Sequence, residues 1–134
     1  MKVVIVDGQG GRLGKMLVEQ LKQRCPQTQL YAIGTNSIAT ATMLKAGADF
    51  GATGENPVVR AVMDADVVLG PMGIVVAHAI LGEVTPVMAE AICVIEAIAS
   101  GLLLSIPMIT RFSGKYCCRM RMAYSISSAR SVIV

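Results

Sequence analysis

The sequence predicts a single Rossmann-like α/β domain, with a doubly wound parallel sheet of four to five strands and helices on both faces in three αβα layers. Three observations carry this prediction. Short aliphatic runs alternate with helix-like segments along the chain. Of the 134 residues, 54% are hydrophobic and only 4% are aromatic, which suits parallel strands buried on both faces. A glycine-rich loop follows the first aliphatic run, as in a phosphate-binding βα unit.

The first thirty-three residues predict a strand, a helix and a second strand. Val3–Val6 is an unbroken β-branched run, and we expect it at the centre of the sheet. Arg12–Arg24 has leucines at helical spacing and stops before Pro26, since the residue before a proline disfavours helical backbone. Leu30–Ile33 is the second strand.

The next thirty residues repeat the pattern. Ile38–Ala46 predicts a helix that ends at Gly47, a typical C-cap residue. Ala48–Phe50 predicts a brief third strand. Gly51–Asn56 is expected as a loop, and Pro57 suits the first turn of a helix that reaches about Met63.

The remaining apolar segments predict one more strand, two helices and a fifth strand. Val67–Leu69 is the strand, Ile74–Leu81 and Pro86–Ser100 are the helices, and Leu102–Ile106 is the fifth strand. Ala91–Ile109 is also nearly all apolar over 19 residues, which is long enough for a membrane span. Because a glutamate, a Ser-Gly pair and a proline interrupt it, a helix end followed by a buried strand explains it better.

Charge divides the chain near residue 110. Residues 1–110 carry a net charge of −2, whereas residues 111–134 carry five basic residues and no acidic one. We therefore expect one nucleotide-binding-like domain over residues 1–110 and a basic tail over residues 111–134. The tail is either disordered or an edge strand facing a phosphate ligand or an acidic partner, and nucleic acid is not the expected partner.

Four loops that follow predicted strands contain glycine. Ligands of parallel α/β sheets bind outside the carboxyl ends of the strands, so these loops predict a nucleotide crevice, although short strand-to-helix turns favour glycine in any case. The predicted cofactor-binding residues are Asp7, Gly8, Gln9, Gly10, Gly11, Arg12, Leu13, Gly14, Gly34, Thr35, Asn36, Gly51, Thr53, Gly54, Gly70, Pro71, Met72 and Gly73.

The first loop, DGQGGRLG, approaches the dinucleotide fingerprint, with its last glycine one residue later than in GxGxxG. It resembles the opening of dihydrodipicolinate reductase and similar NAD(P)-dependent enzymes over about twenty residues. Free amides at the helix start would face a pyrophosphate, and Arg12 and Lys15 would add positive charge. Asp7 would repel a pyrophosphate, so it either hydrogen-bonds loop amides or holds a cation or a ligand hydroxyl.

The end of the second strand lacks the acidic residue that usually binds an NAD ribose. Thr35, Asn36 and Ser37 could bind a 2′-phosphate instead, which mildly favours NADP over NAD; they could equally cap the helix that begins at Ile38.

Catalytic residues cannot be assigned from spacing, and the weak candidates are Glu55, Asn56 and His78. Glu55 lies on an edge loop, where it could be a general base, bind a ribose or be a solvated charge. His78 lies among apolar residues, where packing is the commoner role. One histidine and four cysteines without ligand spacing make no zinc pattern, so no metal is expected and the thiols should be reduced.

Several runs together resemble a family of short bacterial proteins catalogued as domain of unknown function number 3842. These runs are MKVVIVDGQGGRLGK, AIGTNSIATATMLKAGAD, GATGEN, DVVLGPMGIV and LGEVTPVMAEAI. The resemblance extends from Met1 to about Ile92, implies a Rossmann-like domain and brings no established reaction. The sequence after residue 92 departs from the family pattern.

These observations predict a protein that binds NADP or NAD and could be an oxidoreductase; the alternative is a non-catalytic nucleotide-binding or regulatory module. The chain has no second domain for a substrate. Its apolar composition, with a mean hydropathy of +0.61, and the apolar Pro86–Ser100 segment predict a homodimer. No signal peptide or membrane partner is expected, and the expected location is cytoplasmic.

Overall fold

The computed structural model describes residues 1–93, 98–99 and 108–112 of the chain. In chain order the elements are β1 (Lys2–Asp7), α1 (Arg12–Arg24), β2 (Gln29–Gly34), α2 (Ser37–Lys45), β3 (Phe50–Thr53), α3 (Glu55–Met63), β4 (Val67–Pro71), the short 3₁₀ helix η1 (Met72–Val75), α4 (Pro86–Cys93), β5 (Ile98–Ala99) and β6 (Met108–Phe112).

The sheet has the strand order β3-β2-β1-β4-β6-β5. The first four strands in this order are parallel, and β1 lies between β2 and β4 as predicted. The antiparallel strand β6 continues the sheet beyond β4, and β5 pairs with β6. The predicted fifth strand, Leu102–Ile106, lies outside the described residues, as do residues 113–134 of the predicted tail.

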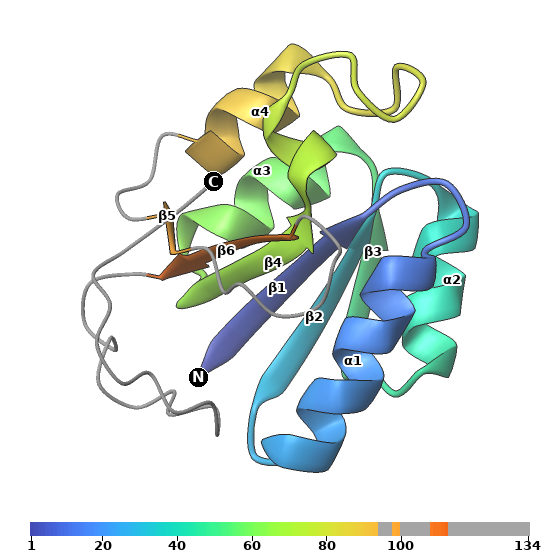
Figure 1. The fold of residues 1–134 in the computed structure, drawn as a ribbon, viewed down its shortest axis with the longest axis vertical. Helices are drawn as coiled ribbons and strands as arrows, with labels where there is room; N and C mark the ends of the chain where they lie inside the picture. The colour runs from blue at the N-terminus through green and yellow to red at the C-terminus, as the bar shows by residue number, and fades with distance from the viewer. Residues whose placement is uncertain (94–97, 100–107, 113–134) are drawn as a thin grey trace.

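Helices cover both faces of the sheet, with α1 and α2 on one face and α3 and α4 on the other (Figure 1). Alternate residues of β1 feed the two cores: Val3 and Ile5 pack with α1 and α2, whereas Val4 and Val6 pack with α3 and α4. All four side chains are buried, because a central parallel strand is covered on both sides. The Rossmann-like, three-layer prediction is confirmed.

Three elements begin or end elsewhere than the sequence predicts. The third strand is Phe50–Thr53 and not Ala48–Phe50, because Gly51–Thr53 pair with β2. α3 starts at Glu55, which leaves Pro57 inside its first turn. The helix predicted to reach Ser100 is wrong at its end, since Ile98–Ala99 forms β5.

The helix predicted over Ile74–Leu81 is wrong. The chain instead forms η1 and then a series of turns, in which His78, Ile80 and Leu81 have φ angles of 65°, 56° and 57°. Because an α-helix needs consecutive residues with negative φ, these left-handed residues exclude it.

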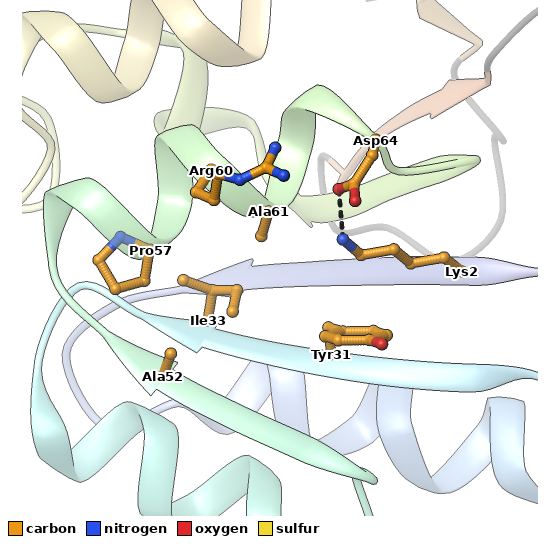
Figure 2. Close-up of a pocket in the computed structure, with 8 residues that line it drawn as sticks. All are labelled: Lys2, Tyr31, Ile33, Ala52, Pro57, Arg60, Ala61 and Asp64. Carbon is orange, nitrogen blue, oxygen red and sulfur yellow. Dashed lines mark hydrogen bonds and ion pairs between the residues drawn. The ribbon is translucent and has the colours of Figure 1, made fainter.

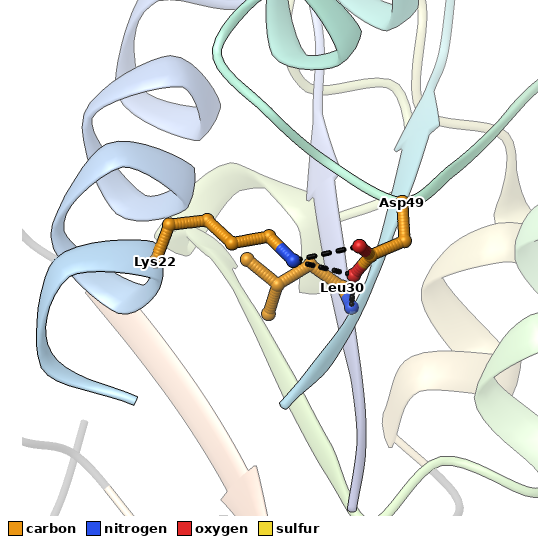
Figure 3. A network of polar contacts seen from close by, with 3 residues as sticks. All are labelled: Lys22, Leu30 and Asp49. Carbon is orange, nitrogen blue, oxygen red and sulfur yellow. Dashed lines mark hydrogen bonds and ion pairs between the residues drawn. The ribbon is translucent and has the colours of Figure 1, made fainter. Parts of the chain in front are cut away.

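A polar network fixes the amino ends of the strands against α1 (Figure 3). Asp49 accepts a hydrogen bond from the Leu30 amide of β2 at 2.8 Å and pairs with Lys22 of α1 at 2.7 Å. The Leu30 amide, followed by Lys22, lowers the pKa of the Asp49 carboxyl. The loops at the opposite, carboxyl ends of these strands are therefore held on a fixed frame.

Within the part of the chain that the structure describes, no helix has the length and apolar character needed to cross a membrane.

Candidate functional site

The carboxyl ends of β1, β2 and β3 lie side by side at one edge of the sheet. Asp7, Gly34 and Thr53 occupy the same level in the strand register. Backbone bonds continue beyond the strands: the Thr35 amide donates to the Asp7 carbonyl at 2.9 Å, and the Gly54 amide donates to the Gly34 carbonyl at 2.9 Å. The structure thus brings three of the four predicted glycine loops together.

The β1–α1 loop is a tight turn shaped by close packing. The Gly11 amide donates to the Gly8 carbonyl at 2.9 Å, and Gly11 has a φ of 67°. A Cβ atom on Gly11 would lie 2.7 Å from the Ala39 backbone of α2. Gly11 is therefore required by its backbone conformation and by the contact between the loop and α2.

Gly10 differs from its neighbours in the loop because packing does not explain it. A Cβ atom there would come no closer than 3.9 Å to another part of the chain, and the φ of Gly10 is not positive. Gly10 is also exposed. The loop consequently presents bare backbone to solvent at the start of α1, the position where a ligand would approach it.

Asp7 is buried beneath the loop with only 5% of its surface exposed. One carboxylate oxygen accepts from the Gly8 amide at 2.8 Å, and the other accepts from the Gly14 amide at 2.6 Å. Burial raises the pKa of Asp7, although the Gly14 and Gly8 amides act in the opposite direction. Of the alternatives for Asp7, hydrogen bonding to loop amides is the arrangement that the structure shows.

Glu83, a residue that the sequence did not predict, joins the first two loops. Its Oε2 atom accepts three hydrogen bonds, from the Gln9 amide at 2.8 Å, the Thr35 hydroxyl at 2.5 Å and the Asn36 side-chain amide at 2.9 Å. The Thr35 hydroxyl, followed by the Gln9 amide, lowers the pKa of Glu83, so the carboxylate form is favoured. The donors thus form a small anion site.

Asn36 has two roles in the structure. Its Oδ1 atom accepts from the Ala39 amide at 2.9 Å and so caps α2. Its side-chain NH₂ group donates to the Gln9 carbonyl at 3.0 Å as well as to Glu83. Asn36 therefore caps α2, as one of the predicted alternatives for this turn, and also hydrogen-bonds Gln9 and Glu83.

The chain between β4 and α4 folds back over the glycine loops. We call residues 76–85 the closing segment. Within it, the His78 amide donates to the Val84 carbonyl at 2.7 Å and so closes the turn on itself. Ile80 comes close to both Gly8 and Gly73, because a Cβ atom on Gly8 would lie 3.0 Å from the Ile80 side chain and one on Gly73 would lie 3.3 Å from it. This segment brings Glu83 to the site.

The weak catalytic candidates do not form a set with Asp7 or Glu83. Glu55, at the start of α3, accepts a hydrogen bond from the Thr85 hydroxyl at 2.5 Å, and Thr85 in turn caps α4 by accepting from the Met88 amide at 3.2 Å. Asn56 and His78 are exposed, and His78 lies on a turn and not on the predicted apolar helix. Glu55 therefore links two helices in this structure.

Packing explains three glycines of the other predicted loops, whereas Gly54 has open space around it and a φ of 106°. A Cβ atom on Gly34 would lie 2.6 Å from the Thr40 backbone amide, and one on Gly51 would lie 2.6 Å from the Leu44 side chain. Gly70 of β4 is buried beside Val6, and a Cβ atom on it would lie 2.7 Å from the Ile74 side chain. The close packing of Gly34, Gly51 and Gly70 therefore accounts for these glycines without a ligand.

A separate hollow of about 260 Å³ lies on the α3 face of the sheet, between α3 and strands β2 and β3 (Figure 2). Its floor is apolar, and the Lys2–Asp64 ion pair lies at one end of it. Lys2 also lies 4.7 Å above the Tyr31 ring, which stacks on Phe50. The hollow is lined by Lys2, Tyr31, Ile33, Ala52, Pro57, Arg60, Ala61 and Asp64. None of these residues was predicted as a site residue.

The sequence did not predict Glu83 as a site residue, because its hydrogen-bond partners lie 47 to 74 residues away along the chain and the contacts depend on turns with left-handed backbone. One signal was available: the turn at the end of the second strand has donors and no acid, while LGEVTP places a carboxylate in a loop beyond the fourth strand.

Among the residues that the structure describes, no three or more His, Cys, Asp or Glu side chains gather as a metal site.

Comparison with known proteins places the chain in a family and gives no activity. The curated proteins and the solved structures yield no match. The family described as "Domain of unknown function (DUF3842)" matches residues 2–111, which is most of the chain. The resemblance inferred from the glycine loops and from GATGEN is confirmed, and this chain belongs to that family.

Proposed function

We propose that this protein binds a nucleotide through a phosphate group at the carboxyl ends of β1 and β2, with NADP or NAD as the first ligands to test. One observation carries the proposal: a main-chain amide, a hydroxyl and a side-chain amide from two loops converge on a single point. They come from Gln9, Thr35 and Asn36, and all three donate to one oxygen atom. Three convergent donors suit an anionic oxygen atom.

The bare backbone at Gly10 supports the same site. Gly11, the N-cap of α1, follows this glycine, and a helix amino terminus favours a bound anion. Arg12, the first residue of α1, is exposed and would add positive charge. The buried Asp7 already takes the Gly8 and Gly14 amides, so the ligand phosphate is expected above the loop, on the side of Gln9 and Thr35.

Binding without turnover is the favoured form of this proposal. Glu55, the best-placed candidate for a general base, is hydrogen-bonded to Thr85 and holds the start of α4. A nucleotide-binding or regulatory module needs only the convergent donors and the open loop. An oxidoreductase would require catalytic groups beyond those that the described residues bring to the crevice.

The test is a fluorescence titration of NADPH and NADH against the wild-type chain and Gly10→Ala. A methyl group at residue 10 has space in the protein but would enter the ligand's position. We expect saturable binding to the wild type, a loss of about tenfold or more in Gly10→Ala, and the same melting temperature for both proteins. A turnover screen on the bound complex separates the module from an oxidoreductase.

Unchanged affinity in Gly10→Ala would contradict binding at this loop. The proposed nucleotide binding is wrong if neither NADPH nor NADH binds saturably to the wild type or to a variant with a substitution in the closing segment, residues 76–85.

A further inference from the structure

The proposed anion position is filled by the protein's own carboxylate. Glu83 Oε2 accepts all three of the convergent hydrogen bonds, and a Cβ atom on Gly8 would lie only 2.8 Å from it. The carboxylate is thus packed directly against the glycine loop. A phosphate oxygen cannot occupy the same point, and a phosphate beside it would meet a like charge.

The closing segment that carries Glu83 contains strained backbone. His78, Ile80 and Leu81 have positive φ angles without being glycine, and Ile80 is β-branched, for which this backbone is a genuine outlier. Leu81 projects into solvent with 93% of its surface exposed. Strained backbone persists only where surrounding contacts hold it, and such segments concentrate at ligand clamps and switches.

The contacts that hold the closing segment are of two kinds: the hydrogen bonds of Glu83 to the loops, and apolar packing in which Val84 is buried in the core. Beyond the Glu83 hydrogen bonds, Ile80 supplies the apolar contact near Gly8 and Gly73. The two ends of the segment are fixed, since η1 precedes it and Thr85 caps α4 after it. Glu83 is therefore the polar attachment of this segment to the glycine loops, and Val84 beside it anchors the segment in the core.

We propose that the closing segment is a gate held shut by Glu83, and that a phosphate group of the ligand replaces the Glu83 carboxylate at Gln9, Thr35 and Asn36. This inference rests on the proposed nucleotide binding. The ligand then competes with an internal anion, and its apparent affinity is reduced by the fraction of molecules in which the gate is closed.

The gate can be tested first without any ligand. Hydrogen exchange by mass spectrometry is compared for the wild type, Glu83→Gln, Glu83→Ala and the control Glu90→Gln, which changes an exposed carboxylate of α4. We expect faster exchange at residues 76–85 and at the Gln9 amide in both Glu83 variants, by about tenfold in Glu83→Ala. The control should match the wild type. Unchanged exchange in Glu83→Ala would overturn the gate.

Titration of NADPH and NADH against the same proteins tests the replacement step. Loss of the internal anion should tighten binding by about tenfold in Glu83→Ala, with a smaller gain in Glu83→Gln and none in Glu90→Gln. A gain confined to NADPH identifies the 2′-phosphate as the replacing group, whereas an equal gain for both ligands identifies the pyrophosphate.

Weaker or unchanged nucleotide binding in Glu83→Ala would overturn the inference, because Glu83 would then be a ligand contact or a bystander. If exchange is faster but no protein binds either nucleotide, the proposed function fails and the replacement step fails with it. The exchange result therefore separates failure of the gate from failure of nucleotide binding.

Discussion

Two carboxylates at the edge of the sheet, Asp7 and Glu83, have pKa values that shift in opposite directions. Asp7 is buried, and desolvation raises its pKa despite two amide donors. Glu83 lies nearer the surface, and the hydrogen bonds from Thr35 and Gln9 lower its pKa. The charge of Glu83 also raises the pKa of Asp7. Asp7 therefore belongs to the permanent structure of the loop, while Glu83 is the group that water and ligands can reach.

Asp7→Asn should destabilise the protein by about 1–3 kcal/mol. Asparagine offers one acceptor oxygen, but the Gly8 and Gly14 amides each need one, so its NH₂ group would face a buried N–H donor. Urea denaturation measures the change in unfolding free energy, and Glu90→Gln is the surface control. A variant as stable as the wild type would show that these two hydrogen bonds do not hold the loop.

The two carboxylates also predict opposite dependences on pH. The pKa of Glu83 is depressed below 4.5, so its contribution to stability is present above that pH and is lost as the pH falls through the folded-state pKa. The pKa of Asp7 is raised above 3.8, so the folded protein binds this proton more tightly and the contribution of Asp7 improves as the pH falls.

Unfolding free energies of the wild type, Glu83→Gln and Asp7→Asn from neutral to acid pH measure both effects. On acidification the wild type should lose stability relative to Glu83→Gln and gain stability relative to Asp7→Asn. Parallel pH profiles for the three proteins would contradict both assignments.

At the scale of elements, the β1–α1 loop packs directly against α2 through Gly11. Gly11→Ala should destabilise the fold by about 2–4 kcal/mol, since it adds left-handed strain to an overlap with the Ala39 backbone. Gly10→Ala, one residue earlier, is the matched control and should leave the unfolding free energy within about 0.5 kcal/mol. Equal effects of the two substitutions on thermal or urea unfolding would be inconsistent with this loop geometry.

Elements with strong local signals were predictable from the sequence, and elements set by distant contacts were not. Arg12–Arg24 was predicted to the residue, because leucine spacing and Pro26 define it locally. β3 was misplaced because this strand is mostly exposed, so no alternation of apolar and polar residues marks Phe50–Thr53. The apolar Ile74–Leu81 run was taken for a helix, yet tertiary contacts impose left-handed turns there.

The same division applies to the candidate site. The glycine loop and the Thr35-Asn36 turn were predicted because the parallel-sheet rule alone places them at one edge. The anion site inside that edge was not predicted, since Glu83 arrives through a turn whose backbone the sequence gives no reason to expect. Local patterns thus predicted which loops meet at this edge, and the folded chain showed that Glu83 joins two of them.

At the scale of the whole molecule, apolar surface remains on the α4 side of the sheet. α4 buries Met88, Ala89 and Ile92 in the core but leaves Val87 with 49% of its surface exposed, and Val76 and Leu81 of the closing segment are also exposed. Part of the apolar surface of α4 from which a homodimer was predicted is therefore buried inside one chain. The exposed remainder is the surface that a second copy would cover.

Sedimentation velocity at micromolar concentration tests the homodimer, which stays a prediction. We expect a dimer for the wild type and a shift toward monomer for Val87→Asp, because a charge at an apolar interface must be desolvated on association. Ile38→Asp is the matched control: Ile38 has 67% of its surface exposed but lies on α2, across the sheet from α4. A monomeric wild type, or equal dissociation by Ile38→Asp, would show that α4 does not mediate assembly. Because Val87 lies two residues after the closing segment, a dimer through α4 would further restrain that end of the gate. Val87→Asp should therefore speed hydrogen exchange at residues 76–85, whereas Ile38→Asp should not.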